Sequence, residues 1–337
     1  MKKILFVYEN NISQYNIPYI KMLKENGIEV HIVSNDKEKN DYCDKYYFSK
    51  FTKKLFSYNN LKVYRKLKNI ISQNKYDVIQ CDNYICGILT RLAARKQKCK
   101  IIYRNFSLAN NIFEYFTEKV LSKYTNIIIT TNIDDYNFSK KKLNIKDVKL
   151  MNGIGIDKGE KVDVNRNKEF YTFFSIGELN KKNNQIIQLE AMIEIIRKYP
   201  QYQLIISVDG KQKEYYEHII EKYGLRENVK IYSNSENLYY TISEGDCFIS
   251  TAKRDYFPIY IIKMMFNNKP IIASNIKEYK NLLKNKNLFK QNNVNELKRK
   301  MFDVIEKNKK YEIYYDIEKY KSKKVLKEMK IIYEIKN

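Results

Sequence analysis

The 337-residue chain has few glycines, prolines and histidines, and it has no long hydrophobic run. Its 9 Gly and 4 Pro leave little room for disordered linkers, so a well-ordered globular protein is expected. No run of about 18 apolar residues is present, and Lys3–Tyr8 already has the pattern of a strand. These features predict neither a membrane-spanning helix nor a signal peptide. The 2 His and 5 scattered Cys form no zinc pattern and no disulfide frame, which predicts reduced thiols in a cytoplasmic protein.

Acidic residues are also scarce, and the formal net charge is +24. The excess is concentrated in residues 50–104, which hold 14 Lys and Arg against Asp77 and Asp82. Within this segment Lys50–Tyr58 interleaves cations with aromatic residues, and an amphipathic basic helix is expected over about 61–71. Such a surface suits an anionic membrane or phosphate-bearing partners. Nucleic acid is not expected, because no helix-turn-helix, zinc-finger or ribonucleoprotein signature accompanies the charge. The alternative is that a general compositional bias towards Lys, Asn, Ile and Tyr explains part of the positive charge.

In the first half of the chain, strand-like segments at about 3–8, 28–33, 77–81, 100–104, 126–131 and 147–151 alternate with helix-like segments, and the second half repeats the alternation. This pattern predicts parallel sheets with helices on both faces. The length fits two domains. We expect two doubly wound, Rossmann-like α/β domains that face each other across a ligand cleft. The expected boundaries are 1–151 for the first domain, 152–168 for a glycine-containing linker, 169–310 for the second domain, and 311–337 for terminal helices (about 312–320 and 322–335) that return to the first domain.

Residues 246–275 are the most informative segment. They predict a buried strand over 247–250, a polar loop, a helix from about Phe257 and a second strand over 270–274. The loop and helix start of such a βαβ unit lie at the carboxyl edge of a sheet, where α/β proteins bind ligands. Lys263 is the one charge in the apolar run 259–266, so it must face water, a carboxylate or an anion. It is either a solvent-facing lysine on a half-covered helix or a lysine that points into a ligand cleft.

Five segments in order resemble the nucleotide-sugar-dependent glycosyltransferases of GT-B fold, in the retaining family 4 group that builds bacterial capsular and exopolysaccharides. The resemblance covers nearly the whole chain. Residues 17–34 look like the family's first helix and second strand, and Thr90–Arg95 looks like a later helix of the first domain. Met151–Asp157 is similar to the linker motif, Ser175–Asn184 to the donor-phosphate loop, and Lys269–Asn275 to the strand after the donor helix. The resemblance implies a nucleotide-sugar donor, a saccharide acceptor and retention of stereochemistry.

The resemblance also implies a donor site, although this chain departs from the family pattern there. Where the family carries Glu-x7-Glu, this chain has Asp255 at the first, catalytic position and Lys263 at the second, with Tyr256 in place of a glycine. An ammonium group cannot accept the ribose hydrogen bonds that a carboxylate accepts, so Lys263 is expected to contact the diphosphate instead. The other expected donor-binding residues are Gly177, Asn180, Lys181, Lys182, Ser250 and Thr251.

The acceptor-side histidines of the family are missing. The family's His-Gly is matched by Phe106-Ser107, and its His-x-His by Gln80-Cys81-Asp82, so no histidine-based catalysis is expected. Two functions therefore stay open. An active transferase would move a sugar to a lipid-linked saccharide at the cytoplasmic membrane face, with Asp255 orienting the donor and fixed cations neutralising its diphosphate without a metal or other cofactor. A catalytically inactive relative would instead bind a partner glycosyltransferase or a glycan.

Overall fold

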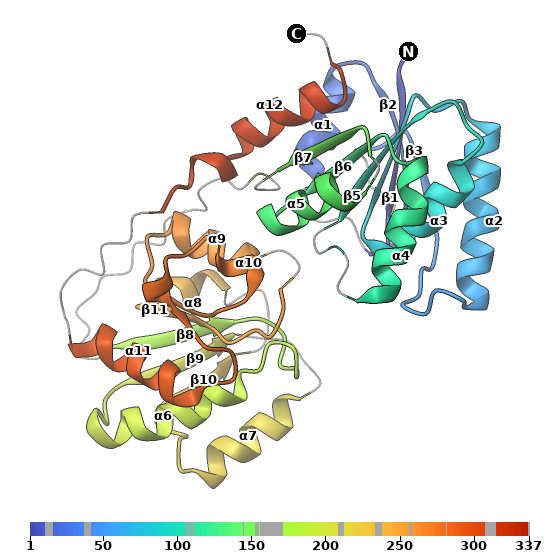
Figure 1. Cartoon of the computed structure of the whole chain (residues 1–337). Helices are drawn as coiled ribbons and strands as arrows, with labels where there is room; N and C mark the ends of the chain where they lie inside the picture. Colours follow the sequence, from blue (N-terminus) through green and yellow to red (C-terminus); the bar gives the residue numbers. More distant parts are fainter. Residues whose placement is uncertain are drawn as a thin grey trace. The chain divides into compact units, whose positions relative to one another are not determined.

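The computed structural model divides the chain into two compact units, each built on a parallel sheet with helices packed on it (Figure 1). Unit 1 consists of Met1–Asp157 and Glu318–Asn337, and unit 2 consists of Lys158–Ile317. The structure describes all residues except 11–15, 37–41, 106–107, 109–110, 144, 152–154, 156–170, 208–211, 233–237, 256–257, 281, 307–314 and 336–337. The expected linker over 152–168 therefore lies outside the described residues, apart from Gly155.

The sheet of unit 1 has parallel strands in the order β3-β2-β1-β4-β5-β6-β7. The strands are β1 Lys3–Tyr8, β2 Glu29–Ser34, β3 Lys45–Phe48, β4 Val78–Asp82, β5 Lys100–Asn105, β6 Ile127–Thr130 and β7 Asp147–Leu150. All but β3 were predicted within about two residues of these bounds. β3 is an edge strand of four residues, none of them buried, and its short aromatic run Tyr46–Phe48 was not recognised as a strand.

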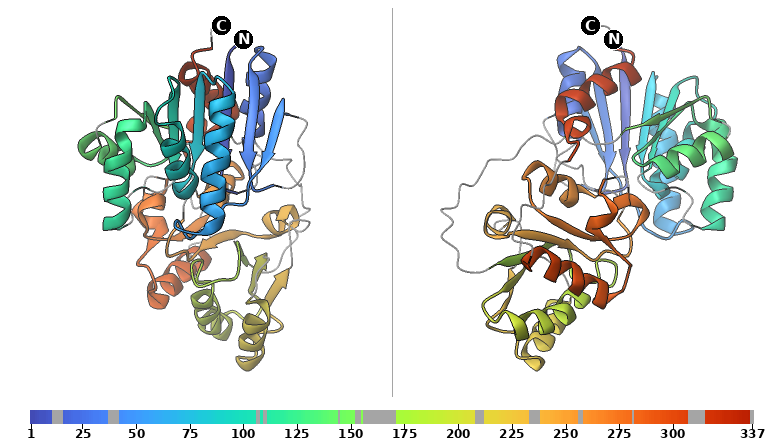
Figure 2. Two further views of the ribbon diagram at one scale, coloured as in Figure 1. Left: turned by 90° about the vertical axis from the view of Figure 1, so that its right-hand side faces the viewer. Right: turned by 60° about the vertical axis from the view of Figure 1, so that its left-hand side comes forward.

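Helices cover both faces of this sheet. They are α1 Ile17–Glu25, α2 Tyr58–Gln73, α3 Tyr84–Ala94, α4 Ile112–Leu121, α5 Ile133–Lys142 and α12 Ser322–Ile332. Ser57, Asn111 and Asn132 stand at the N-caps of α2, α4 and α5, where each side-chain oxygen accepts a hydrogen bond from the third N–H that follows. Figure 2 shows α1 and α12 on one face of the sheet and α2 and α3 on the other, and each face has its own apolar core.

The C-terminal segment belongs to the core of unit 1. Val325, Met329 and Tyr333 are buried in the same cluster as β1 and α1. Lys2 adds a polar contact, since its Nζ donates to the backbone carbonyl of Tyr333 at 2.6 Å. The α-helix expected over 312–320 is not found in its described part, where Glu318–Tyr320 forms only a 3-10 turn.

Unit 2 repeats the architecture with strands in the order β10-β9-β8-β11-β12-β13. Its strands are β8 Thr172–Ile176, β9 Gln203–Ser207, β10 Val229–Tyr232, β11 Cys247–Ser250, β12 Ile271–Ser274 and β13 Leu288–Phe289. Its helices are α6 Ile186–Lys198, α7 Lys213–Lys222, α8 Leu238–Glu244, α9 Ile259–Phe266, α10 Lys277–Lys280 and α11 Val294–Glu306. β11, α9 and β12 confirm the predicted βαβ unit, and the two sheets confirm the predicted pair of doubly wound α/β folds. In the part of the chain that the structure describes, no helix combines the length and apolarity needed to cross a bilayer.

Candidate functional site

The carboxyl ends of β8 and β11 are the place where the topology of unit 2 predicts a ligand. The two strands pair directly in the middle of the sheet. The chain runs outward from β8 to β9 and β10 on one side, and from β11 to β12 and β13 on the other. The loops that follow β8 and β11 therefore turn in opposite directions and leave a crevice at the carboxyl edge.

A cavity of about 210 Å³ occupies this position. Its walls come from the loop after β8, the loop after β11, the first turn of α9 and a tyrosine of α10. A volume of this size holds a phosphate group or a sugar ring and falls below the roughly 300–1,000 Å³ of sites that enclose a whole drug-sized ligand. Five of the predicted site residues line it, namely Gly177, Lys182, Ser250, Thr251 and Asp255.

The loop after β8 has a backbone that depends on its sequence. Gly177 has φ +140°, a conformation that L side chains rarely adopt, so a glycine is needed where the strand turns into the loop. Asn180 then fixes the next turn, because its Oδ1 accepts from the N–H groups of Lys182 at 3.0 Å and Asn183 at 2.8 Å. Asn180 does not line the cavity itself, so the structure places it as a support for the loop.

The loops after β8 and β11 are tied to each other. The N–H of Lys253 donates to the carbonyl of Lys182 at 2.8 Å, and the Thr251 hydroxyl donates to the carbonyl of Asn183 at 2.9 Å. Thr251 is buried, and it also accepts from Gln188 Nε2 at 2.9 Å. These contacts fix the backbone of both loops around the cavity. The backbone of Lys182 is therefore held in place beside the cavity.

Asp255 is held by a buried tyrosine. The hydroxyl of Tyr279 lies 2.9 Å from Asp255 Oδ2 and 2.8 Å from Ser250 Oγ, and all three residues line the cavity. Burial, and then the neighbouring Asp255 carboxylate, raise the pKa of Tyr279 well above its ordinary value. The hydroxyl therefore keeps its proton and donates it towards the carboxylate, which orients the Asp255 side chain at the cavity wall.

The remaining predicted site residues lie elsewhere. Lys181 is exposed and does not line the cavity. Lys263 is half-buried on α9, one turn beyond the cavity-lining Tyr260, with its Nζ 5.9 Å from the centroid of the Tyr260 ring. Tyr256 lies outside the described residues.

Sequence reasoning missed three residues of this site. Tyr279 carried no signal, because an isolated tyrosine in a Lys-rich stretch looks like a surface residue. Gln185 lines the cavity, and Gln188 lies fully buried behind it with its Nε2 3.2 Å from Ser175 Oγ. Gln188 could have been found, because a polar residue among the apolar positions of α6 needs a buried partner.

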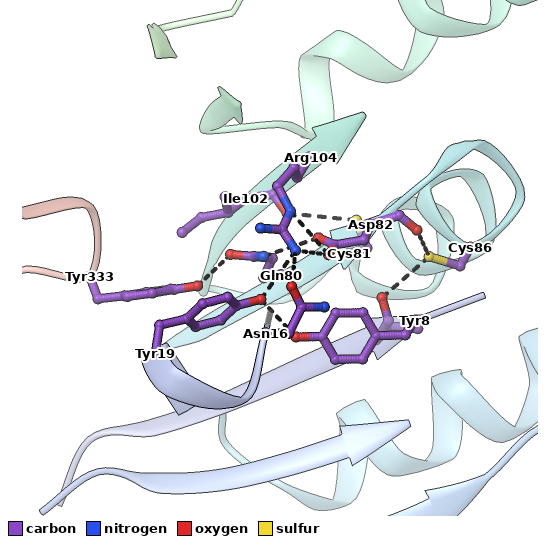
Figure 3. A network of polar contacts seen from close by, with 11 residues as sticks. Tyr8, Asn16, Tyr19, Gln80, Cys81, Asp82, Cys86, Ile102, Arg104 and Tyr333 are labelled. Atoms are coloured by element: carbon purple, nitrogen blue, oxygen red, sulfur yellow. Dashed lines mark hydrogen bonds and ion pairs between the residues drawn. The ribbon is translucent and has the colours of Figure 1, made fainter. Parts of the chain in front are cut away.

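The corresponding edge of unit 1 is filled by a buried polar network (Figure 3). Tyr8, Asp82 and Arg104 stand opposite one another on three neighbouring strands. Asp82 and Arg104 form an ion pair in which both side chains are at most 3% exposed. Gln80 joins them, since its Nε2 donates to Asp82 Oδ1 at 3.0 Å and its Oε1 accepts from the hydroxyl of Tyr333.

Arg104 has further partners at the N-cap and in the first turn of α1. Its guanidinium donates to Asn16 Oδ1 at 2.9 Å and to the hydroxyl of Tyr19 at 3.1 Å. Burial by itself lowers the pKa of Arg104, but the Asp82 carboxylate outweighs it and the pKa is raised well above its ordinary value. For Tyr19, burial raises the pKa to about 12, so this hydroxyl stays neutral. Gln80-Cys81-Asp82, which matches the family's His-x-His, therefore makes an internal structural network.

Neither histidine lies in a second candidate site among the residues that the structure describes. His31 is buried in β2 with Nδ1 2.7 Å from the Tyr76 hydroxyl, and His218 is exposed on α7. Among the described residues, no group of three or more His, Cys, Asp and Glu side chains is placed to hold a metal ion.

Both halves of the chain match glycosyltransferase family models. Residues 3–132 match the model described as "Glycosyl transferase 4-like", and residues 157–322 match "Glycosyl transferases group 1". EpsD of Bacillus subtilis, which is named as a glycosyltransferase, is 27% identical over 84% of this chain and 81% of its own length. The capsular polysaccharide biosynthesis glycosyltransferase CapH of Staphylococcus aureus is 26% identical over 58% of this chain and 54% of its own length.

Solved structures share the fold along nearly the whole chain. A sucrose-phosphate synthase from Thermosynechococcus elongatus superposes with a TM-score of 0.82 at 14% identity, over 99% of this chain and 98% of that one. HepE of Anabaena, in complex with UDP-glucose, has a TM-score of 0.76 at 14% identity, over 99% and 100% of the two chains. The family models, the curated relatives and the two parallel sheets all agree with the resemblance seen in the sequence. The chain belongs to the family 4-like glycosyltransferases of GT-B fold.

Proposed function

We propose that this chain transfers a sugar from a nucleotide-sugar donor to a saccharide acceptor carried on a lipid, in the synthesis of a cell-surface polysaccharide. One observation carries the proposal. The cavity at the carboxyl ends of β8 and β11 brings together Gly177 and Lys182 from the loop after β8 and Asp255 from the loop after β11. The polysaccharide role is supported by the name of CapH, and the complex of HepE with UDP-glucose makes uridine donors the first to test.

The cavity suits the chemistry of glycosyl transfer. The bond between the anomeric carbon and the diphosphate breaks, and its electron pair leaves with the nucleoside diphosphate, which gains a negative charge. The oxygen of an acceptor hydroxyl bonds to the anomeric carbon, and the hydroxyl proton passes to the departing phosphate oxygen. Lys182, which lines the cavity, supplies an ammonium group that neutralises this charge. Asp255, oriented by Tyr279, accepts hydrogen bonds from hydroxyls of the sugar and holds it for the acceptor. These roles need no metal ion or other cofactor.

A catalytically inactive partner subunit is the second candidate. It is favoured by Lys263, which stands where the family has its ribose-binding carboxylate, and by Asp255, whose carboxylate already engages a tyrosine of the same chain. Under this function the cavity would bind no nucleotide sugar, and the protein would act by binding a partner glycosyltransferase or a glycan.

Thermal-shift titration separates the two functions. We expect UDP, UDP-glucose, UDP-N-acetylglucosamine, UDP-galactose, GDP or GDP-mannose to stabilise the protein by about 2.7 kcal/mol at 100 times the dissociation constant, because the ligand binds only the folded state. Lys182→Ala should abolish the shift, since Lys182 lines the cavity. Lys181→Ala is the matched control, because the neighbouring exposed lysine does not line it. If no nucleotide raises the melting temperature of the wild-type protein at millimolar concentration, the result supports the partner-subunit function instead.

Tyr279→Phe tests the support of Asp255. Loss of the hydroxyl removes the hydrogen bond to Asp255 Oδ2, so we expect kcat for sugar transfer to fall about 10- to 100-fold with little change in KM. Steady-state kinetics, with melting temperature as the check on folding, measure this effect. An unchanged kcat would show that Asp255 holds its position without Tyr279, and a raised KM alone would assign the tyrosine to donor binding.

A further inference from the structure

Unit 1 carries an apolar groove on the surface formed by α2, α3 and α4, which we call the α2–α4 groove. Its volume is about 780 Å³, and apolar atoms make up most of its wall. Leu55 and Phe56 before α2, Leu61 of α2, Leu92 of α3, and Phe116 and Val120 of α4 are among its lining residues. α3 packs between α2 and α4 and forms the floor of the groove. The groove lies within one unit and is far in sequence from the donor cavity.

The rim of this groove presents large apolar side chains to solvent. Phe56 is 91% exposed, Phe116 is 57% exposed and Val120 is 59% exposed. On α4, exposed apolar residues recur at Ile112, Phe116 and Val120, which places them in one stripe along the helix. Scattered apolar residues are ordinary on a protein surface, but a stripe beside an apolar hollow is typical of a binding surface.

Cations surround the groove and acids are rare there. Segment 50–68, which lines one wall through residues between Leu55 and Tyr64, holds seven Lys and Arg and no Asp or Glu. All seven side chains are exposed, namely Lys50, Lys53, Lys54, Lys62, Arg65, Lys66 and Lys68. On the other wall, α4 carries two acids. The carboxylate of Glu118 is buried and turned inward to Arg91 at 2.8 Å, and Glu114 is half-buried and accepts from Asn111 Nδ2 at 3.2 Å. The surface around the groove is therefore strongly positive.

We propose that the α2–α4 groove docks the protein on an anionic lipid bilayer, with Phe56 and Phe116 inserted among the lipids and the lysines of α2 and its preceding loop on the headgroups. Aromatic side chains beside a row of lysines match the boundary between acyl chains and anionic headgroups. A second copy of the chain fits poorly, because a two-fold contact through this face would bring two positive surfaces together. The inference does not depend on the proposed function, since docking needs no nucleotide sugar.

Tryptophan fluorescence tests the docking directly. The chain has 0 Trp, so Phe56→Trp introduces one reporter at the rim of the groove. Tyr215→Trp is the control reporter, because Tyr215 is 57% exposed on α7 of unit 2. With the full chain and no nucleotide, we expect vesicles of phosphatidylcholine and phosphatidylglycerol to shift the Phe56→Trp emission to the blue and leave the Tyr215→Trp emission unchanged. Vesicles of phosphatidylcholine alone should give a much smaller shift.

Vesicle partitioning of further variants separates the apolar and the charged contributions. Phe56→Ser with Phe116→Ser should weaken partitioning about 100-fold, which is tenfold for each ring withdrawn from the bilayer. Lys53→Gln with Lys54→Gln should weaken it about 25-fold, or fivefold for each charge. Tyr215→Ser with Tyr223→Ser, and Lys222→Gln with Lys230→Gln, are the matched controls from exposed positions of unit 2.

Three results would overturn the proposal. The first is an unchanged Phe56→Trp emission with anionic vesicles. The second is equal loss of partitioning in the unit 2 controls, which would mean that net charge alone attracts the chain. The third is a blue shift that grows with protein concentration when no vesicles are present, because it would assign the groove to a second copy. Phe56→Trp is a conservative change at an exposed position, so the test does not depend on whether the serine variants fold.

Discussion

Replacing Arg104 by methionine is expected to lower the free energy of unfolding by about 3–5 kcal/mol, because it leaves the buried Asp82 carboxylate without its cation. Both side chains are at most 3% exposed, and Arg104 also holds Asn16 and Tyr19 of α1. The loss therefore reaches the contact between α1 and the sheet as well as the ion pair. Urea unfolding followed by circular dichroism measures the change, with the slope of the transition as the check on two-state behaviour.

Two further variants identify the cause. Arg104→Met combined with Asp82→Leu removes both charges, so most of the lost stability should return, as it does when a buried pair is replaced by apolar groups. Lys198→Met breaks an ion pair with Glu306 in which both side chains are about half exposed, and it should leave the unfolding midpoint unchanged. If the double variant is as unstable as Arg104→Met alone, the loss comes from packing or from the bonds to α1 rather than from an unpaired carboxylate.

Asp255→Asn is expected to slow sugar transfer by about 10²–10³-fold, because the amide has lost the charge that the pre-oriented carboxylate offers to the reacting sugar. The variant should still bind the donor nucleotide, since Lys182 and the loop after β8 are untouched. The rate is measured as hydrolysis of the nucleotide sugar that gives the largest thermal shift, in which water takes the place of the saccharide acceptor and nucleoside diphosphate is released. Asp303→Asn, at a half-buried aspartate of α11, is the control from the same unit.

The outcome also decides between the two functions. A wild-type protein that binds a nucleotide sugar and turns it over, with a rate that depends on Asp255, is an active transferase whose donor site works without the second carboxylate of the family. A wild-type protein that binds the nucleotide sugar without any turnover would contradict the role given to Asp255. The substitution at position 263 would then be the first change to reverse, with Lys263→Glu, in search of activity.

Much of the fold could be predicted because apolar runs and alternating elements are local features of the sequence. The unbroken apolar run of β1 and the segment from β11 to β12 were found within about two residues. β3 was missed because its run of three aromatic residues, although these favour strands, does not stand out in a chain with 31 Tyr and 16 Phe. The 3-10 turn at Glu318–Tyr320 was mistaken for part of a helix because its sequence is rich in helix-forming residues.

The site was predictable only where a motif marks it. Gly177, Lys182 and Asp255 follow strands at positions that the family pattern shows, and the structure brings them to one cavity. Tyr279 comes from a helix of four residues that is 24 positions away from Asp255 along the chain, and only the folded sheet brings the two together. Arg104 is a similar case, since a single arginine at a strand end does not show in advance whether it faces a ligand or a buried aspartate.

The placement of α12 has a consequence for the order in which the chain folds during synthesis. Val325, Met329 and Tyr333 complete the apolar core that begins at β1 and includes α1, so the part of this core that α12 covers stays open until the ribosome has made residues 322–333. Unit 2 is continuous in sequence, and its residues are all synthesised before those of α12. Nascent unit 1 must therefore wait with exposed apolar surface while unit 2 is made and folds, which is the period when a chaperone would be needed most.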